Sequence, residues 1–124
     1  MARKILVIDD EPHILITVSN RLRANGYEVV TALSGRQGLE SAKELQPDLI
    51  LLDCIMPEMP GEEVLHRLKE DPALGSIPVI MFTANIRKSS VSEFRLRGAA
   101  GVVFKPFAAD DLLHAVAAAF GDNS

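Results

Sequence analysis

The sequence predicts a single doubly wound α/β sandwich, and three observations favour it. Short apolar runs recur along the chain, segments with helical periodicity separate them, and charged residues follow several of the runs. Runs that are apolar without alternation are typical of strands covered on both faces, as in a parallel sheet. Five repeats of strand and helix therefore predict a five-stranded parallel sheet with helices on both faces.

Five runs supply the predicted strands, and each is rich in β-branched or aliphatic residues. They are 5–8 (ILVI), 28–32 (EVVTA), 48–52 (DLILL), 78–82 (PVIMF) and 101–104 (GVVF). Sheets of this class commonly have the strand order 2-1-3-4-5, so the order reverses between the first and third strands. That reversal is where such sheets bind ligands, beyond the carboxyl ends of the strands.

Amphipathic segments between the runs predict five helices. They cover residues 13–25, 34–45, 61–70, 90–97 and 109–120. Ser34 and Gln37 have the spacing of a capping box at the start of the second helix. Ser90 and Glu93 have the same spacing at the start of the fourth. Gly26 and Pro47 stand where the first and second helices should end.

Length and composition favour one globular domain in the cytoplasm. A chain of 124 residues can bury roughly two thirds of its unfolded surface. The net charge of −4 excludes an overall basic field for nucleic acid or an anionic membrane surface. No apolar run approaches the roughly 20 residues that cross a bilayer, and we find no secretory signal. The single cysteine, Cys54, fits a reducing compartment and is expected to be a small buried hydrophobe.

Polar residues that end the strands predict a site at the carboxyl edge of the sheet. They are Asp9 and Asp10 after the first strand, Asp53 after the third, Thr83 and Ala84 after the fourth, and Lys105 and Pro106 after the fifth. Three converging carboxylates need a counter-charge, and Mg²⁺ fits because it prefers oxygen ligands; Mn²⁺ is a second possibility. With the lysine and a hydroxyl donor, such a pocket is suited to phosphoryl transfer onto a carboxylate.

The motifs at these strand ends resemble the response-regulator receiver domain of two-component phosphorelay signalling. The resemblance covers almost the whole chain, through KILVIDDE, LLDCIMPEMPG, VIMFTA and VVFKPF in this order. It implies a flavodoxin-like (CheY-like) fold and a single receiver domain over residues 1–124, without an output domain in this chain. It also implies a protein that catalyses only its own phosphorylation and dephosphorylation, and is not otherwise an enzyme.

The resemblance implies a role for each acidic residue. Asp53 would accept a phosphoryl group from a phosphohistidine on a histidine kinase or a histidine phosphotransfer protein. Asp9, Asp10 and Asp53 would hold Mg²⁺ together with the backbone carbonyl of Ile55, and Asp10 would be the more direct ligand from the first strand.

The resemblance also implies roles for the other residues of the site. Thr83 would bind a phosphoryl oxygen and Lys105 would pair with the acyl phosphate. The Lys105–Pro106 peptide bond is expected to be cis, a form found almost only before proline.

The predicted switch is the face formed by the fourth helix, the fifth strand and the fifth helix. A phosphoryl group near Thr83 would reshape this face, which would bind an output partner or a second copy. The residues expected to switch or to tune the site are Thr83, Ala84, Asn85, Val102, Phe104 and Pro106. Neither nucleic acid nor a membrane is expected as a partner of this domain.

Two positions depart from the family's pattern. Most relatives carry an aromatic residue three positions before the lysine, and this chain has Val102, which has no ring to gate a cavity. Phe104 points to the same side of the strand and is a hypothetical replacement; the alternative is an ordinary core phenylalanine. Ile55, like Asn85, should tune dephosphorylation. Because Ile55 offers no group to orient water, we predict a long-lived phosphoryl state.

Three alternative functions can be compared with these residues, and two of them require residues that this chain lacks. A degenerate receiver would bind partners without phosphorylation, and the missing aromatic at Val102 favours it. An aspartyl-phosphate hydrolase would usually carry an acid at the position of Ile55, and a dinucleotide-binding domain would carry a glycine-rich turn where this chain has DDEPH. The intact set of acids, hydroxyl and lysine favours the phosphorylated receiver.

Overall fold

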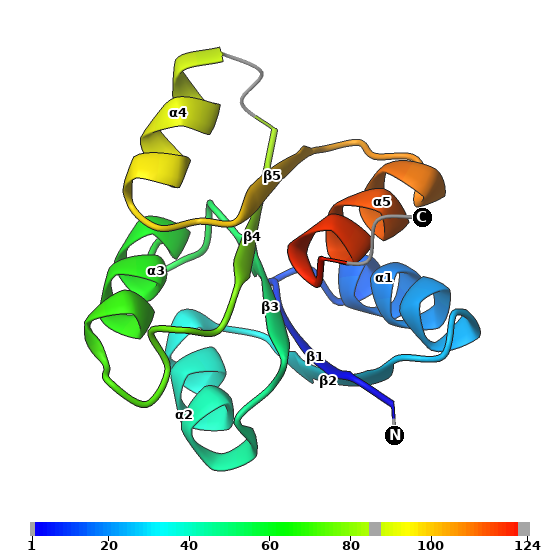
Figure 1. The fold of residues 1–124 in the computed structure, drawn as a ribbon, viewed down its shortest axis with the longest axis horizontal. Helices are drawn as coiled ribbons and strands as arrows, with labels where there is room; N and C mark the ends of the chain where they lie inside the picture. The colour runs from blue at the N-terminus through cyan, green and yellow to red at the C-terminus, as the bar shows by residue number, and fades with distance from the viewer. Residues whose placement is uncertain (1, 85–87, 122–124) are drawn as a thin grey trace.

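A computed structural model describes residues 2–84 and 88–121 of the chain, with the side chains of residues 88–90 left aside. Its core is a parallel sheet in the order β2-β1-β3-β4-β5, which confirms the predicted fold and strand order (Figure 1). The strands are β1 (Lys4–Ile8), β2 (Glu28–Ala32), β3 (Leu49–Asp53), β4 (Val79–Thr83) and β5 (Gly101–Phe104). Asp53 and Thr83 are thus the last residues of their strands, one position later than the predicted ends.

Five helices cover the two faces of the sheet. They are α1 (Pro12–Ala24), α2 (Gly35–Leu45), α3 (Gly61–Glu70), α4 (Lys88–Leu96) and α5 (Ala109–Ala119). Figure 1 shows α1 and α5 on one face and α2, α3 and α4 on the other. None of the helices in the described residues is long and apolar enough to cross a membrane.

The structure corrects two of the predicted helix caps, at α4 and α2. α4 begins at Lys88, so Ser90 lies inside this helix and does not cap it. At the start of α2 the Ser34 hydroxyl accepts the Gln37 N–H at 3.1 Å, as predicted. The Gln37 side chain, however, accepts from the N–H of Leu33 at 2.7 Å, one residue before the position that a capping box requires.

Alternate residues of each strand enter two separate core clusters. On the face of α2, α3 and α4, the cluster includes Leu6, Ile8, Ile50, Leu52 and Met81. On the face of α1 and α5, it includes Ile5, Val7, Leu49, Leu51 and Phe82. The runs are apolar throughout because both of their faces are covered.

Strand register sets the positions of the polar residues at the carboxyl edge. β3 pairs with β4 so that Asp53 is opposite Phe82, and β4 pairs with β5 so that Thr83 is opposite Phe104. Asp9 follows β1 directly and donates its N–H to the Ala32 carbonyl at 3.1 Å, which extends the pairing with β2 by one bond. The strands therefore deliver the predicted polar residues to one edge of the sheet.

Candidate functional site

Three aspartates gather at the carboxyl edge of the sheet. One carboxylate oxygen from each of Asp9, Asp10 and Asp53 lies within 4.8 Å of the other two. Asp9 is 0% exposed and Asp53 is 5% exposed, whereas Asp10 is partly exposed. Two of the three acids are therefore held largely out of solvent, beside a third that solvent can reach.

Lys105 joins two of these acids. Its Nζ donates to Asp9 Oδ2 at 2.9 Å and to Asp53 Oδ1 at 3.0 Å. Because β4 lies between β5 and β3, the lysine side chain must reach past the end of β4 to make both bonds. The Lys105 N–H donates to the Thr83 carbonyl at 2.8 Å, and the Lys105–Pro106 peptide bond is cis, as expected.

Burial and charge shift the pKa values of the site. Burial raises the pKa of Asp53 from 3.8 to about 6; the negative charges of Asp9 and Asp10 act in the same direction, and Lys105 opposes them. Burial also disfavours the charged form of Lys105, but its hydrogen bonds to Asp9 and Asp53 outweigh this, so the pKa of Lys105 is raised. The positive charge of one lysine thus only partly compensates the negative charge of three carboxylates.

The backbone around β1 fixes the orientation of Asp9. Its Oδ1 accepts the N–H of Glu11 at 2.9 Å, while its Oδ2 accepts from Lys105. α1 begins at Pro12, immediately after this turn. Both oxygens of the most buried acid are therefore held before any ligand binds.

Gly61, the first residue of α3, supports the site although it is not among the residues predicted to form it. Its N–H donates to the Cys54 carbonyl at 3.0 Å, and a Cβ placed on it would lie 2.2 Å from the Asp53 carbonyl oxygen. Only a residue without a side chain lets α3 start this close to the backbone of Asp53. The signal was present in the motif LLDCIMPEMPG, which ends in this glycine.

Cys54 and Thr83 lie together on the α2–α4 side of the sheet. Cys54 is 8% exposed and Thr83 is 3% exposed, so both side chains are largely removed from solvent. Burial raises the pKa of the Cys54 thiol to about 12, although the neighbouring Thr83 opposes the shift. The prediction of a small buried hydrophobe is confirmed, whereas its position beside Thr83 was not predicted.

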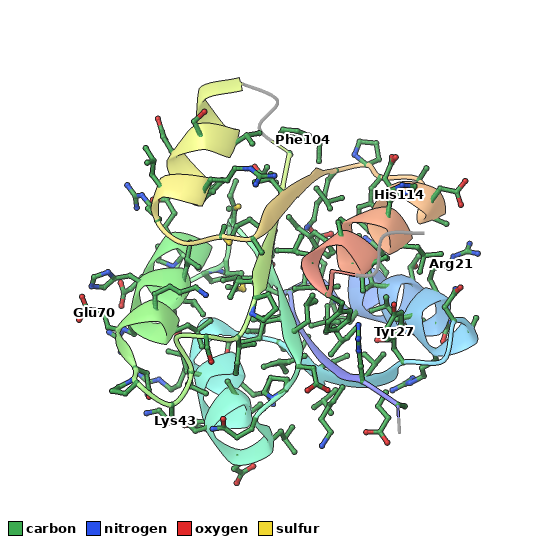
Figure 2. All side chains as sticks on the ribbon, viewed as in Figure 1. Arg21, Tyr27, Lys43, Glu70, Phe104 and His114 are labelled. Carbon is green, nitrogen blue, oxygen red and sulfur yellow. The ribbon has the colours of Figure 1, made fainter. Side chains whose placement is uncertain are left out.

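The predicted tuning residues differ in their surroundings. Val102 packs against the α2–α4 core cluster, whereas Phe104 is partly exposed at the end of β5 (Figure 2). The Ile55 side chain is 76% exposed in the segment that links β3 to α3. Ala84 and Pro106 are exposed as well, and Asn85 lies outside the described residues.

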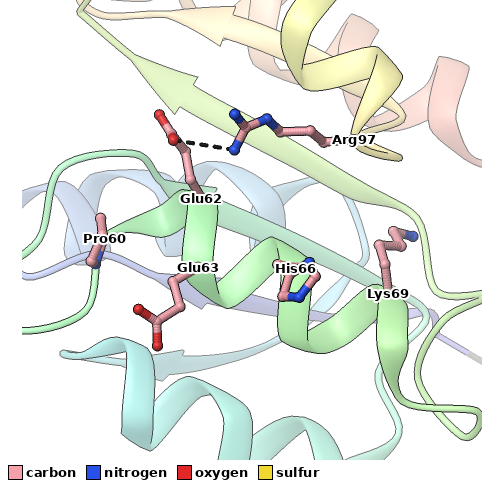
Figure 3. Close-up of a pocket in the computed structure, with 6 residues that line it drawn as sticks. All are labelled: Pro60, Glu62, Glu63, His66, Lys69 and Arg97. Atoms are coloured by element: carbon pink, nitrogen blue, oxygen red, sulfur yellow. Dashed lines mark hydrogen bonds and ion pairs between the residues drawn. The ribbon is translucent and has the colours of Figure 1, made fainter.

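A separate groove lies between α3 and the end of α4 (Figure 3). It is lined by Pro60, Glu62, Glu63, His66, Lys69 and Arg97. An ion pair joins Arg97 to Glu62 at 3.3 Å across this groove. Both side chains are more than half exposed, so the pair contributes little stability, about 0–1 kcal/mol.

The sheet order, the acidic cluster and the lysine together define a receiver fold with an acidic pocket. A family model described as "Response regulator receiver domain" matches residues 5–117. The chain therefore belongs to the response regulator receiver domain family, whose members are signalling domains of two-component systems.

Two curated proteins and one solved structure illustrate this relationship. The chain is 32% identical over 122 residues to the polar-differentiation response regulator DivK of Brucella abortus, covering 98% of this chain and 99% of DivK. It is 39% identical over 115 residues to the DNA-binding dual master transcriptional regulator RpaA of Synechocystis, covering 93% of this chain and 48% of RpaA. The chain thus spans about half the length of RpaA. The chemotaxis response regulator CheY4 of Vibrio cholerae superposes with a TM-score of 0.91 at 32% identity, over 96% of this chain and 99% of CheY4.

Proposed function

We propose that this chain is a phosphorylatable signalling receiver in which Asp53 accepts a phosphoryl group from a phosphohistidine donor. The observation that carries the proposal is the gathering of three carboxylate oxygens within 4.8 Å, beside a lysine 3.0 Å from Asp53. Receiver domains interact with histidine kinases and with output domains. A histidine kinase or a histidine phosphotransfer protein is therefore the donor that we propose.

The acidic cluster fits a hard divalent cation. Its ligand atoms are all carboxylate oxygens, which Mg²⁺ prefers and which Mn²⁺ also accepts. Asp9, Asp10 and Asp53 would hold the ion, together with the backbone carbonyl of Ile55. When bound, the cation would neutralise negative charge on the transferred phosphoryl group.

The chain's own residues would carry out the transfer. An oxygen of Asp53 forms a bond to phosphorus while the phosphorus–nitrogen bond of the donor breaks, and the imidazole keeps the electron pair. Lys105 neutralises charge on the acyl phosphate, and the Thr83 hydroxyl donates to a phosphoryl oxygen. Water later attacks the phosphorus, releases inorganic phosphate and restores the Asp53 carboxylate.

The signal would leave through the face formed by α4, β5 and α5. Thr83 is opposite Phe104 at the end of β5, so a change at Thr83 adjoins this face directly. We propose that residues 1–124 act as one cytoplasmic receiver domain and that this face binds an output partner or a second copy. Val102 favours the second candidate, a receiver that binds partners without phosphorylation, because valine has no ring that could change position on phosphorylation.

Mass spectrometry after incubation with acetyl phosphate and Mg²⁺ separates the two candidates. The intact protein should gain one phosphoryl group, and Asp53→Ala should gain none. Asp110→Ala, which removes an exposed acid from the first turn of α5, is the matched control and should behave as the intact protein does. An unmodified intact protein, or equal modification of Asp53→Ala, would contradict the proposed acceptor. Chelation of the cation should abolish the gain.

A further inference from the structure

We infer that the ion pair between Glu62 and Arg97 is a restraint that holds α4 in its unphosphorylated position and so opposes the phosphorylated state. Glu62 lies in the first turn of α3 and Arg97 directly follows α4, so the pair joins two helices across the groove shown in Figure 3. The inference rests on the proposed function and assigns a regulatory role to two residues outside the acidic site.

The helix α4 has few buried side chains to fix its position. Within residues 91–96, the part of α4 whose side chains the structure describes, Phe94 alone is buried, at 7% exposed. The neighbouring helix α3 buries three apolar side chains, those of Val64, Leu65 and Leu68. Elements with few buried apolar contacts change position at low free-energy cost. A change at the site can therefore displace α4 more readily than α3.

The start of α3, in contrast, is fixed to the backbone that carries Asp53. The Gly61 N–H donates to the Cys54 carbonyl at 3.0 Å, and a Cβ placed on Gly61 would lie 2.2 Å from the Asp53 carbonyl oxygen. Glu62 is the next residue, so its backbone has little freedom to follow α4. A displacement of α4 therefore changes the distance of 3.3 Å between Arg97 Nη1 and Glu62 Oε2, which is already longer than most N–H···O hydrogen bonds.

Phosphorylation of Asp53 would act on α4 through β4. Thr83 is the last residue of β4, and α4 is the next helix along the chain. An ion pair that is stronger in the unphosphorylated state than in the phosphorylated one shifts the equilibrium toward the unphosphorylated state. Removal of the pair should therefore favour the phosphorylated conformation and tighten the binding of a phosphoryl group at Asp53.

Beryllofluoride in the presence of Mg²⁺ tests this expectation, because it forms a stable analogue of an aspartyl phosphate. Its affinity is measured by calorimetric titration of the intact protein and of Glu62→Gln. The variant should bind it about twofold more tightly, and at most about fivefold, because an ion pair exposed to this extent is weak.

Glu63→Gln is the matched control, because it removes the same charge from the adjacent residue in the first turn of α3. The partner of Glu63 is Arg67, at 2.7 Å and one turn further along the same helix. This second ion pair does not join two helices, so its loss should leave the affinity for beryllofluoride unchanged.

A double-mutant cycle distinguishes the ion pair from a general effect of charge. In an Arg97→Gln background, Glu62→Gln should no longer change the affinity, because its partner is already gone. Salt screens exposed charges, so the difference between Glu62→Gln and the intact protein should also disappear at roughly 1 M sodium chloride.

Four results would overturn the inference: equal affinities of Glu62→Gln and the intact protein, weaker binding by Glu62→Gln, an equal gain in Glu63→Gln, or a gain that persists in the Arg97→Gln background. Absence of beryllofluoride binding by the intact protein would instead contradict the proposed function. Circular dichroism verifies that each variant is folded.

Discussion

Asparagine in place of Asp53 should stabilise the cation-free protein at neutral pH. The carboxylate is 5% exposed, and burial raises its pKa from 3.8 to about 6. This difference between the pKa values of the folded and unfolded chain lowers the free energy of unfolding by about 3 kcal/mol at a pH where Asp53 is ionised in both states. An asparagine has no charge to bury and retains an oxygen that can accept from Lys105.

The sign of this effect makes it depend on pH. The pKa of the folded state lies above that of the unfolded state, so ionisation favours the unfolded chain. The penalty is absent below pH 3.8, grows between pH 3.8 and about 6, and is complete above that range. Asp53→Asn should therefore be more stable than the intact protein by about 3 kcal/mol at pH 7.5 and by about half of that at pH 5.

Urea denaturation in the presence of EDTA measures both differences. Asp110→Asn, the matched substitution of an exposed acid, should change the free energy of unfolding by at most about 0.5 kcal/mol. Adding Mg²⁺ should reduce the difference in stability between Asp53→Asn and the intact protein. The cation stabilises the folded protein that binds it, and the intact carboxylate is a better ligand than the amide. A variant no more stable than the intact protein at pH 7.5, or a gap independent of pH, would refute the reasoning.

Three further substitutions test the surroundings of the site. Gly61→Ala should lower the free energy of unfolding by about 2 kcal/mol or more, because its Cβ would lie 2.2 Å from a backbone oxygen. Gly101→Ala is the control and should lower it much less, because its Cβ would meet only a side-chain atom at 3.9 Å. Equal losses would contradict this steric argument. Ile55→Asn should shorten the half-life of the phosphorylated protein, measured by loss of label. Ile16→Asn, the same substitution at another exposed isoleucine, is the control and should leave the half-life unchanged. A half-life of Ile55→Asn at least as long as that of the intact protein would count against the role of Ile55. Phe104→Ala should weaken phosphorylation-dependent partner binding, measured by co-elution, if this ring replaces the missing aromatic. Unchanged binding would contradict that role for Phe104, whose ring is partly exposed.

The number of parallel strands and their ends could be predicted from local patterns, and the strand order from what is common in sheets of this class; together these predict the meeting of the acids. Continuous apolar runs identify buried parallel strands, and parallel strands all end at the same edge of the sheet. Asp9 and Asp53 are therefore brought together by topology, although 43 residues separate them in the chain. The prediction needed no knowledge of side-chain conformation, only of where each strand stops.

The contacts that tune the site could not be predicted in this way. The position of Thr83 beside Cys54 depends on the register of β3 against β4, which the apolar runs leave undetermined by one or two residues. The reach of Lys105 to Asp9 depends on a side-chain conformation. The role of Gly61 depends on how closely α3 approaches β3. Each is a property of tertiary packing and not of the local sequence.

The sheet, and not attraction among its polar groups, assembles this acidic cluster. Asp9 and Asp53 repel each other, and a single ammonium from Lys105 lies between them. What holds them is the apolar core beneath, where β1 and β3 are almost wholly buried and each large side chain contributes about 1.5–3 kcal/mol. A core of that size can tolerate the penalty of about 3 kcal/mol at Asp53. Under the proposed function, the destabilised Asp53 carboxylate would then meet a cation or an incoming phosphoryl group without rearrangement of the strands.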